Sequence, residues 1–161
     1  MINTVYILLG SNLGNKEQNL KKTIDLINNN IGEIINFSNI YYSKPWGFNS
    51  NNEFVNQAIK INTQLSPVDL LKHTQFIEKE IGRENKPNKN IYTDRIIDID
   101  ILFYNDIIHE TSDLIIPHPL LHKRLFTLKP LNEIAGNFIH PIFKKSISKL
   151  LDNLKATKKD C

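Results

Sequence analysis

The segment 95–104 alternates apolar residues with aspartates, and this alternation constrains the fold more than any other part of the 161-residue chain. Successive side chains of a β-strand point to opposite faces of the sheet, so Asp98 and Asp100 share one face. The opposite face carries apolar side chains, namely Ile97, Ile99, Ile101 and Phe103. The segment therefore predicts a strand with one buried face and one face that holds two carboxylates, with their α-carbons about 6.5 to 7 Å apart.

Other segments of the chain have the patterns of strands and helices. Two apolar runs with helical spacing begin at a good capping residue, Asn15 in one run and Ser66 followed by Pro67 in the other, and each run stops at a glycine. Short runs rich in β-branched and aromatic residues predict strands. The predicted elements are strands at 4–9, 34–42, 54–61 and 95–104, and helices that end at Gly32 and Gly82.

The predicted order is strand, helix, strand, strand, helix, strand, followed by a partly helical C-terminal extension that contains several prolines. This order is typical of the α+β class with a ferredoxin-like βαββαβ core, in which helices cover one face of an antiparallel sheet. The other face is then free for chemistry. The length suits a single domain with one core, and we expect residues 1–161 to form one domain.

The composition excludes several classes of protein. Cys161 is the only cysteine, so a disulfide framework or a cysteine-based zinc site within one chain is excluded. No apolar run approaches the length of a membrane span, and we expect a cytoplasmic protein without a membrane partner. The net charge is only +3, and the dense basic run at 155–159 is interpreted as a solvated end rather than a nucleic-acid-binding patch.

Two aspartates on one face of a strand favour a bound metal ion. Aspartate is disfavoured in strands, and two like charges in a low-dielectric setting resist ionisation unless a cation is present. Oxygen ligands without a partnering Cys or His favour a hard ion, and Mg²⁺ with a bound phosphate is the commonest case. Asp98 and Asp100 are therefore the predicted metal ligands. The alternative is an edge strand whose aspartates are merely solvated.

The same alternation applies to the segment 54–61, where Val55 and Ile59 fall on one face and Phe54 and Asn56 on the other. If the odd positions of both strands pack on the helices, Phe54 and Asn56 share a face with the two aspartates. A ring beside an amide suits a flat, hydrogen-bonding heterocycle, because the ring stacks and the amide both donates and accepts. The alternative is a core aromatic residue followed by a turn residue.

The chain has three arginines, Arg83, Arg95 and Arg124, and otherwise uses lysine for positive charge. Positions that still carry arginine are candidates for needing its planar fork, which suits phosphate groups. The alternative is that three residues are too few to have a meaning. The arginines are therefore candidate phosphate ligands.

Further polar residues lie near these positions in the sequence. Gln75 and Glu78 are three apart on the second predicted helix and share a face beside its apolar stripe, where they either reach a ligand or are solvated. His118 lies between two prolines, in a stiff segment suited to holding an imidazole in a fixed place, although a lone histidine is more often structural or exposed. The polar segment 84–94 is predicted to be a mobile lid.

Together these residues resemble the 6-hydroxymethyl-7,8-dihydropterin pyrophosphokinase family. The segment 95–101 is similar to the family's R-x-x-D-(L/I)-D-(I/L) signature. Further similar motifs, in order along the chain, are 9–13, 54–56, 73–78 with 82–83, and 117–119 with Arg124 and Phe126. The resemblance runs through nearly the whole chain. The sequence differs from the family at 92–94, before the arginine of the signature, and at Lys44.

The resemblance implies transfer of pyrophosphate from ATP to the hydroxymethyl group of 6-hydroxymethyl-7,8-dihydropterin, giving AMP and the pterin diphosphate in folate biosynthesis. It implies that Asp98 and Asp100 bind two Mg²⁺ ions, with ATP as co-substrate, and that Arg83 and Arg95 engage phosphates as the lid closes. The implied pterin-binding residues are Ser43, Pro45, Trp46, Phe54, Asn56 and Phe126. The implied ATP-binding residues are Gln75, Glu78, Ile101, His118 and Arg124.

Two other functions compete with this interpretation. A ferredoxin-like nucleic-acid-binding module needs basic and aromatic residues on the sheet face, where this chain places two aspartates. A general two-metal nucleotidyl transferase also uses paired acidic residues but does not need Phe54 and Asn56. We therefore expect a monomeric pterin pyrophosphokinase domain with small-molecule substrates and without a nucleic-acid partner.

Overall fold

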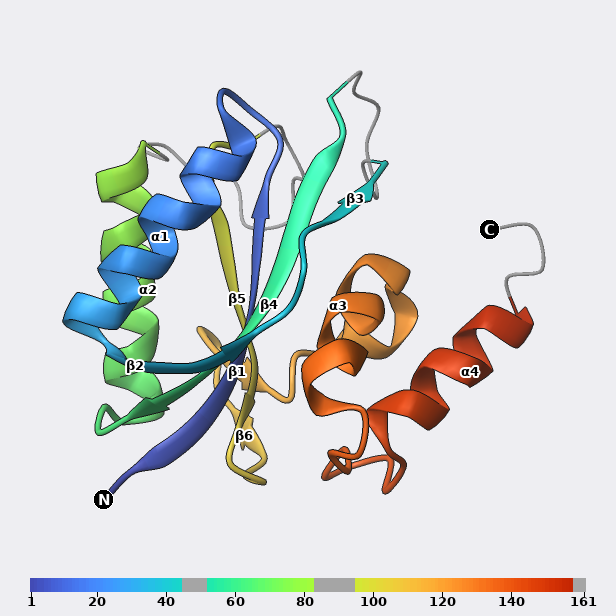
Figure 1. Ribbon diagram of the computed structural model, residues 1–161. Helices are drawn as coiled ribbons and strands as arrows, with labels where there is room; N and C mark the ends of the chain where they lie inside the picture. Colours follow the sequence, from blue (N-terminus) through green and yellow to red (C-terminus); the bar gives the residue numbers. More distant parts are fainter. Residues whose placement is uncertain (45–51, 83–94, 158–161) are drawn as a thin grey trace.

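The main sheet is antiparallel, with β1 in an interior position (Figure 1). The computed structural model describes residues 1–44, 52–82 and 95–157. The strands are β1 (Asn3–Ser11), β2 (Gly32–Phe37), β3 (Tyr41–Ser43), β4 (Phe54–Thr63), β5 (Asp98–Tyr104), β6 (His109–Glu110) and β7 (Ile115–Ile116). The helices are α1 (Lys16–Asn30), α2 (Pro67–Ile81), α3 (Leu125–Ala135) and α4 (Ile147–Thr157), with the short 3-10 helix η1 (Leu121–Lys123).

The strand order in the main sheet is β2-β4-β1-β5, with β3 paired to β4, and all of these pairings are antiparallel. This confirms the predicted mixed class with an antiparallel sheet. The predicted strand 34–42 is instead two strands, β2 and β3, and Ser38 explains the break. The carbonyl of Ser38 accepts a hydrogen bond from Gln57 Nε2 at 2.8 Å, and its hydroxyl accepts one from the Ala58 N–H at 3.0 Å. Side-chain hydrogen bonds therefore interrupt the regular ladder at this point.

Both predicted helix starts are confirmed. The side chain of Asn15 accepts a hydrogen bond from the Gln18 N–H at 3.2 Å, and Ser66 Oγ accepts one from the Asp69 N–H at 3.2 Å. Each bond satisfies a backbone donor that the first helical turn leaves unpaired. Gly82 ends α2 as predicted, with φ at 130°, a conformation that favours glycine.

Gly32 does not end α1, contrary to the prediction. The helix ends at Asn30 with Ile31 as its cap residue, and Gly32 begins β2. A Cβ on Gly32 would overlap the carbonyl oxygen of Asn62 in β4. The glycine is therefore explained by the close approach of two strands rather than by a helix cap.

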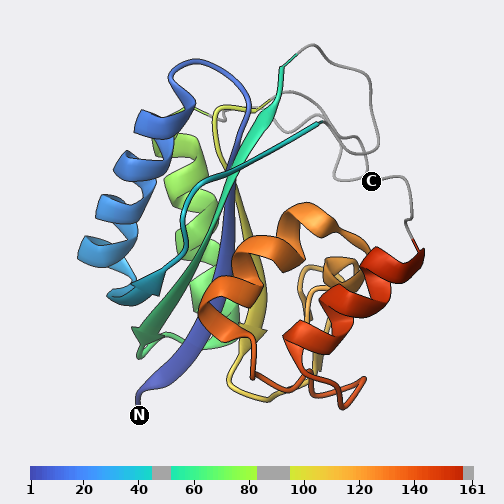
Figure 2. The same ribbon diagram turned by 45° about the vertical axis from the view of Figure 1, so that its right-hand side comes forward.

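Helices cover both faces of the main sheet. α1 and α2 pack on one face. α3 packs on the opposite face and α4 packs against α3, as Figures 1 and 2 show from two directions. The sheet therefore has a core on each side, and the core on the α3 side is built from Tyr6, Leu8, Ala58, Leu102 and Phe103 of the sheet together with Leu121, Leu128, Leu131, Leu150 and Leu151. The core helices thus lie on one face as predicted. The other face is not wholly free, because the C-terminal helices bury their own apolar stripes against part of it.

The predicted alternation along β5 fails at Phe103. Tyr6 of β1 pairs with Phe103 and Ile7 pairs with Ile101, so that Leu102 is an extra residue at a β-bulge. A bulge places two residues of one strand opposite a single residue of its neighbour. Leu102 and Phe103 consequently both belong to the core under α3 and α4, whereas Phe103 was predicted to lie on the opposite face.

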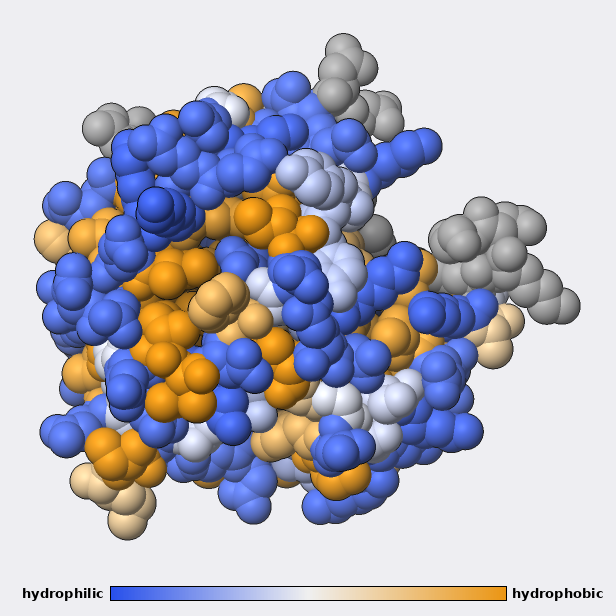
Figure 3. All heavy atoms as spheres, viewed as in Figure 1, coloured by the Kyte–Doolittle hydropathy of each residue, from blue (hydrophilic) through white to orange (hydrophobic). Residues whose placement is uncertain are grey.

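The surface seen from the side of α1 is mainly hydrophilic, with apolar residues gathered near β2 (Figure 3). Ile35 and Phe37 of β2 are among the exposed large apolar residues. Across residues 1–44, 52–82 and 95–157, no helix is both long enough and apolar enough to cross a membrane.

His140 is buried in the connection between α3 and α4, with only 2% of its surface exposed. Its Nδ1 accepts hydrogen bonds from the N–H groups of Ile142 and Phe143 at 3.1 and 3.2 Å. The rings of His140 and Phe143 are stacked, with 4.4 Å between their centroids. Burial and, to a lesser degree, the nearby His122 lower the pKa of His140 to about 4. The ring is therefore neutral at pH 7.

We predict that the free energy of unfolding decreases as the pH falls from about 6.5 towards 4, by about 2 kcal/mol at pH 5 from His140 alone. In this range His140 binds a proton in the unfolded state but not in the folded state, whose pKa is about 4. Urea unfolding at pH 7 and pH 5 measures the difference. His140→Gln is expected to make this pH dependence less steep by the contribution of His140, and an equally steep dependence in that variant would contradict the assignment.

Candidate active site

Strand pairing aligns three polar-face positions in one row across the sheet. Gly10 of β1 pairs with Asn56 of β4 on one side and with Asp98 of β5 on the other. In the next row of the same face, Leu8 pairs with Asp100 of β5. Residues directly opposite each other on neighbouring strands project to the same face. The face that is apolar under α3 and α4 is therefore polar in the row of Gly10.

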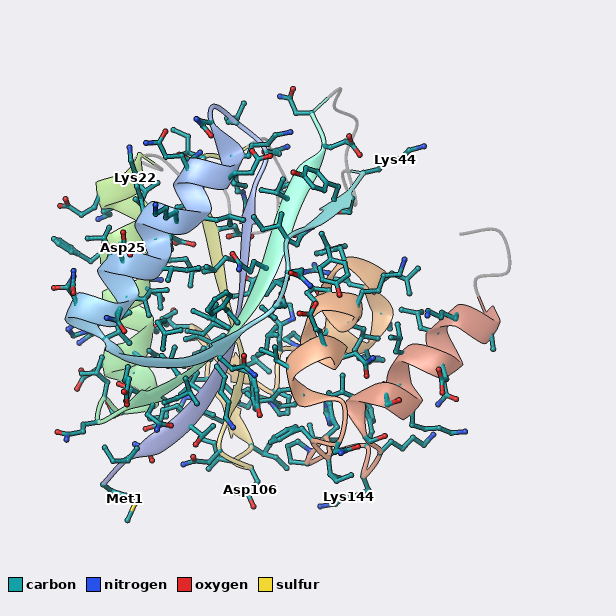
Figure 4. The ribbon with its side chains drawn as sticks, in the orientation of Figure 1. Met1, Lys22, Asp25, Lys44, Asp106 and Lys144 are labelled. Carbon is teal, nitrogen blue, oxygen red and sulfur yellow. The ribbon has the colours of Figure 1, made fainter. Side chains whose placement is uncertain are left out.

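The side-chain amide of Asn56 lies beside Gly10, which has no side chain. Asn56 is 2% exposed, and its Nδ2 donates a hydrogen bond to Ser43 Oγ of β3 at 2.8 Å. A Cβ added to Gly10 would lie 3.3 Å from Asn56 Oδ1 and 3.6 Å from Cδ1 of Phe54. The prediction that Phe54 and Asn56 share one face is thus confirmed. Figure 4 shows Lys44, the residue after β3, pointing away from the sheet.

Asp98 and Asp100 lie on the same side of β5, and both line one cavity. Arg95 Nη1 is 3.1 Å from Asp98 Oδ1, and the two side chains are 8% and 21% exposed. In the part of the chain that the structure describes, no three His, Cys, Asp or Glu side chains come together as a metal-binding group. Two carboxylates alone fit a hard ion such as Mg²⁺, which takes its other oxygen ligands from phosphates and water.

Asparagine contacts fix the position of Arg95. Asn12 Oδ1 accepts a hydrogen bond from the Arg95 N–H at 2.6 Å, and the Arg95 carbonyl accepts one from the Asn12 N–H at 2.9 Å. Asn19 Nδ2 donates to the carbonyls of Leu13 at 2.9 Å and of Ile96 at 3.3 Å. The turn after β1 is thus joined to the residues that precede β5. The structural role of Asn12 and Asn19 was not predicted, because their partners are remote in sequence.

A cavity of about 270 Å³ lies beside β5, between α2 and the segment 112–119. The predicted site residues that line it are Gln75, Glu78, Asp98, Asp100, Ile101 and His118. Six predicted residues from three separate segments therefore meet at one place. Ser112, Asp113 and Leu114 also line the cavity but were not predicted, since no local sequence pattern shows that this segment returns to β5.

β5 is an edge strand, so its outer backbone groups face this cavity. Glu78 Oε2 accepts a hydrogen bond from the Ile99 N–H at 2.9 Å. Gln75 lies on the same face of α2, as the spacing predicts. The helix thus presents a carboxylate and an amide to the open edge of the strand.

His118 is held by its own backbone and by its ring. Its N–H donates to the Leu102 carbonyl at 3.0 Å, and its Nδ1 accepts from the Leu120 N–H at 3.2 Å. Burial and then the positive charge of Arg124 lower the pKa of His118 to about 4, although Asp98 acts in the opposite direction. The imidazole is therefore neutral at pH 7 and, with Nδ1 accepting, carries its proton on Nε2. It is a neutral hydrogen-bond donor at the cavity wall.

Arg124 and Phe126 lie at the N-terminal end of α3. Arg124 is 4% exposed, and its guanidinium carbon is 5.4 Å from the centroid of the Phe126 ring. Its charge also acts on His118. These two predicted residues are thus close to one another, and Arg124 is close to the cavity as well.

Other predicted residues lie outside the described parts of the chain. They are Arg83, Pro45 and Trp46, together with the predicted lid 84–94, which includes the differences from the family at 92–94. Their predicted roles stay predictions.

A family profile described as 7,8-dihydro-6-hydroxymethylpterin-pyrophosphokinase (HPPK) matches residues 6–136. The chain belongs to the HPPK family. The 2-amino-4-hydroxy-6-hydroxymethyldihydropteridine pyrophosphokinase of Porphyromonas gingivalis is 38% identical over 138 residues, which cover 85% of this chain and 93% of that protein. The protein of the same name from Aquifex aeolicus is 42% identical over 144 residues, which cover 89% of this chain and 88% of that protein. The resemblance predicted from the motifs is confirmed.

Solved HPPK structures have the same architecture. The crystal structure of wild-type Plasmodium falciparum HPPK-DHPS matches 99% of this chain with a TM-score of 0.79 at 17% sequence identity. This chain spans 46% of the length of that chain. At this identity the similarity shows the fold alone.

We predict that Asn12→Ala lowers the free energy of unfolding by about 1 to 3 kcal/mol, because it leaves the buried Arg95 N–H without its acceptor. Urea unfolding measures the loss. Asn29→Ala is the matched control, since Asn29 is exposed on α1 and its replacement should change stability by less than about 0.5 kcal/mol. Equal stability of the two variants would show that the contact with Arg95 contributes nothing.

Proposed function

We propose that this HPPK-family protein transfers a pyrophosphoryl group from ATP to the hydroxymethyl oxygen of 6-hydroxymethyl-7,8-dihydropterin, which gives AMP and the pterin diphosphate in folate biosynthesis. The family match over residues 6–136 and the two relatives named for this pyrophosphokinase support it. The structural observation that carries the proposal is the row Asn56, Gly10, Asp98. It sets a hydrogen-bonding amide and a carboxylate on either side of a residue without a side chain.

The pterin binds over Gly10 in this proposal. A flat heterocycle needs a flat floor, and Gly10 supplies one because it has no Cβ. The hydrogen bond from Asn56 to Ser43 fixes the amide, with Oδ1 near Gly10. In the complete proposed pterin site, Asn56 and the loop that contains Ser43, Pro45 and Trp46 hydrogen-bond the pterin. Phe54 and Phe126 stack on the two faces of its ring.

ATP occupies the cavity beside β5. Neutral His118 donates a hydrogen bond from Nε2 to an oxygen of the nucleotide, and Arg124 adds a positive charge beside it. The outer edge of β5 near Ile101 binds the base. The proposed ATP-binding residues are Gln75, Glu78, Ile101, His118 and Arg124, with Arg83 and Arg95 at the phosphates.

Asp98 and Asp100 hold Mg²⁺ in this proposal, as two ions. Their donor set suits such ions, since it consists of oxygen atoms and leaves coordination positions for phosphate oxygens. Bound Mg²⁺ neutralises phosphate charge and polarises the group that is transferred. Arg95, which pairs with Asp98 at 3.1 Å, then engages a phosphate in place of the carboxylate.

The reaction joins the hydroxymethyl oxygen to the β-phosphorus of ATP and breaks the bond between that phosphorus and the oxygen that stays with AMP. The hydroxyl proton is released to solvent water in the same process. Such transfers depend mainly on positioning and on charge neutralisation. Asn56 positions the pterin, His118 and Arg124 position the nucleotide, and Arg95 balances the charge that develops on the phosphates.

We assign the fold to the ferredoxin-like class, with a partly helical C-terminal extension. The element order β1, α1, β2, β4, α2, β5 and the sheet order β2-β4-β1-β5 support this assignment. We further propose that residues 1–161 act as one pterin pyrophosphokinase domain. In this proposal the protein is a cytoplasmic monomer that binds small-molecule substrates.

Incubation of the pure protein with ATP, Mg²⁺ and 6-hydroxymethyl-7,8-dihydropterin is expected to produce AMP and the pterin diphosphate in equal amounts, measured by chromatography. ADP as the only nucleotide product, or no turnover, would refute the proposed function. Asp98→Asn and Asp100→Asn should each lower kcat by about a hundredfold or more, because the metal loses a charged ligand.

Asp106→Asn is the control for these two variants. Asp106 is exposed in the turn after β5, at the opposite end of the strand from Asp98 (Figure 4). It should retain wild-type turnover. Circular dichroism checks that all three variants are folded, and near-normal turnover in Asp98→Asn or Asp100→Asn would contradict their role as metal ligands.

Gly10→Ala is expected to weaken pterin binding about tenfold or more, because the new methyl group would press on Asn56 Oδ1 and occupy the floor of the site. Fluorescence titration with the pterin measures the effect. Gly136→Ala is a matched control: its Cβ meets Asn132 O at 3.1 Å, a similarly close contact, but at the end of α3. Unchanged pterin affinity in Gly10→Ala would place the heterocycle elsewhere.

A further inference from the structure

Two adjacent tyrosines of β3 point to opposite faces of the sheet, and the hydroxyl of each one donates a hydrogen bond to a glutamate. Tyr41 pairs with Asn56 in the ladder, and its hydroxyl donates a hydrogen bond to Glu133 Oε1 of α3 at 2.7 Å. Tyr42 lies on the opposite face, and its hydroxyl donates to Glu17 Oε2 of α1 at 2.7 Å. The short strand is therefore joined to one helix on each side of the sheet.

The two glutamates differ in what they hold. Glu133 also accepts hydrogen bonds from the backbone N–H of Asn39, at 3.2 and 3.0 Å to its two oxygens, and from Asn39 Nδ2 at 3.2 Å. The Glu133 carboxylate thus binds both Asn39, which precedes β3, and Tyr41, the first residue of β3. The hydrogen bond to Glu133 raises the pKa of Tyr41. The Tyr41 side chain therefore remains a protonated phenol over the physiological pH range. The contacts are at the surface, so the carboxylate is accessible rather than part of a core.

Glu133 and the proposed pterin site share two structural elements. α3 packs against β3 and β4, and it carries Phe126 about two helical turns before Glu133. β3 carries Ser43, which accepts the hydrogen bond from Asn56 Nδ2. The Glu133 carboxylate therefore joins α3, which carries Phe126, to β3, whose Ser43 fixes the amide of Asn56.

We propose that Glu133 is a positioning residue for the pterin, which sets the distance between α3 and the β3–β4 ladder and so the width of the slot between Phe126 and Phe54. The inference rests on the proposed function, because it takes the pterin to lie between these two rings. Glu133 does not touch the pterin. It acts through Tyr41 and Asn39, and ATP binds at a different place, in the cavity beside β5.

The structure offers a matched control on the opposite face. Glu17 and Tyr42 form the same kind of exposed hydrogen bond from the same strand, at the same distance of 2.7 Å. α1, which carries Glu17, holds none of the proposed pterin residues. Loss of this second bond removes one tyrosine–glutamate hydrogen bond from β3, as Tyr41→Phe does on the other face, but leaves the contacts of Glu133 with Asn39 and Tyr41 in place.

The test compares Glu133→Ala and Tyr41→Phe with Glu17→Ala and Tyr42→Phe. Dissociation constants are measured by titration for the pterin and, separately, for a non-hydrolysable ATP analogue with Mg²⁺. Glu133→Ala should weaken pterin binding by about fivefold or more, and Tyr41→Phe by about threefold, because a charge-assisted hydrogen bond is lost. Binding of the ATP analogue should stay within about twofold in all four variants, as should pterin binding in the two control variants.

Unchanged pterin affinity in Glu133→Ala would overturn the inference. An equal loss of pterin and ATP-analogue binding would also overturn it, because that result indicates general loosening of the fold rather than control of one slot. If the wild-type protein forms no AMP and binds no pterin, the proposed function itself has failed, and the inference falls with it. A wild-type protein that is active beside a Glu133→Ala variant with normal pterin affinity refutes the inference alone.

Discussion

The pairing register of β1 with its two neighbours is the constraint on which the rest of the structure depends. It places Gly10 between an amide and a carboxylate, and Leu8 and Tyr6 of the same face under the C-terminal helices. A slip by one residue would turn every side chain of β1 to the other face. This register divides one face of the sheet into an apolar part and a polar part. It also places Gly10 at the floor of the proposed site.

The local features were predictable from the sequence because they depend on neighbouring residues alone. The shared face of Asp98 and Asp100 follows from the period of a strand, and the starts of α1 and α2 follow from the hydrogen-bonding capacity of Asn15 and Ser66. The motifs also identified the family, since several of them occur in the right order.

Features that depend on contacts between distant segments were not predictable in this way. The bulge that moves Phe103 to the other face depends on how β1 pairs with β5, and Gly32 reflects the approach of β4. The same reason applies to Asn12 and Glu133, whose partners are remote in the sequence. A pattern of one segment carries no information on which other segment will lie beside it.

Two buried arginines, rather than lysines, carry positive charge at the proposed site. Arg95 and Arg124 are both buried, and a guanidinium keeps its charge in such a place where an ammonium would lose it more readily. His118, in contrast, is neutral, with a pKa of about 4. A tetra-anionic nucleotide would therefore meet fixed positive charge at the arginines and an uncharged donor at the imidazole.

The exposed edge of β5 has a consequence for the behaviour of the protein in a crowded solution. An edge strand with unsatisfied backbone groups is a template on which another chain adds a strand and aggregation begins. Here the Ile99 N–H donates to Glu78 and the Leu102 carbonyl accepts from His118, so two outward-facing groups of the edge already have partners. The same contacts that shape the cavity also block strand addition, and a nucleotide bound there would cover the edge further.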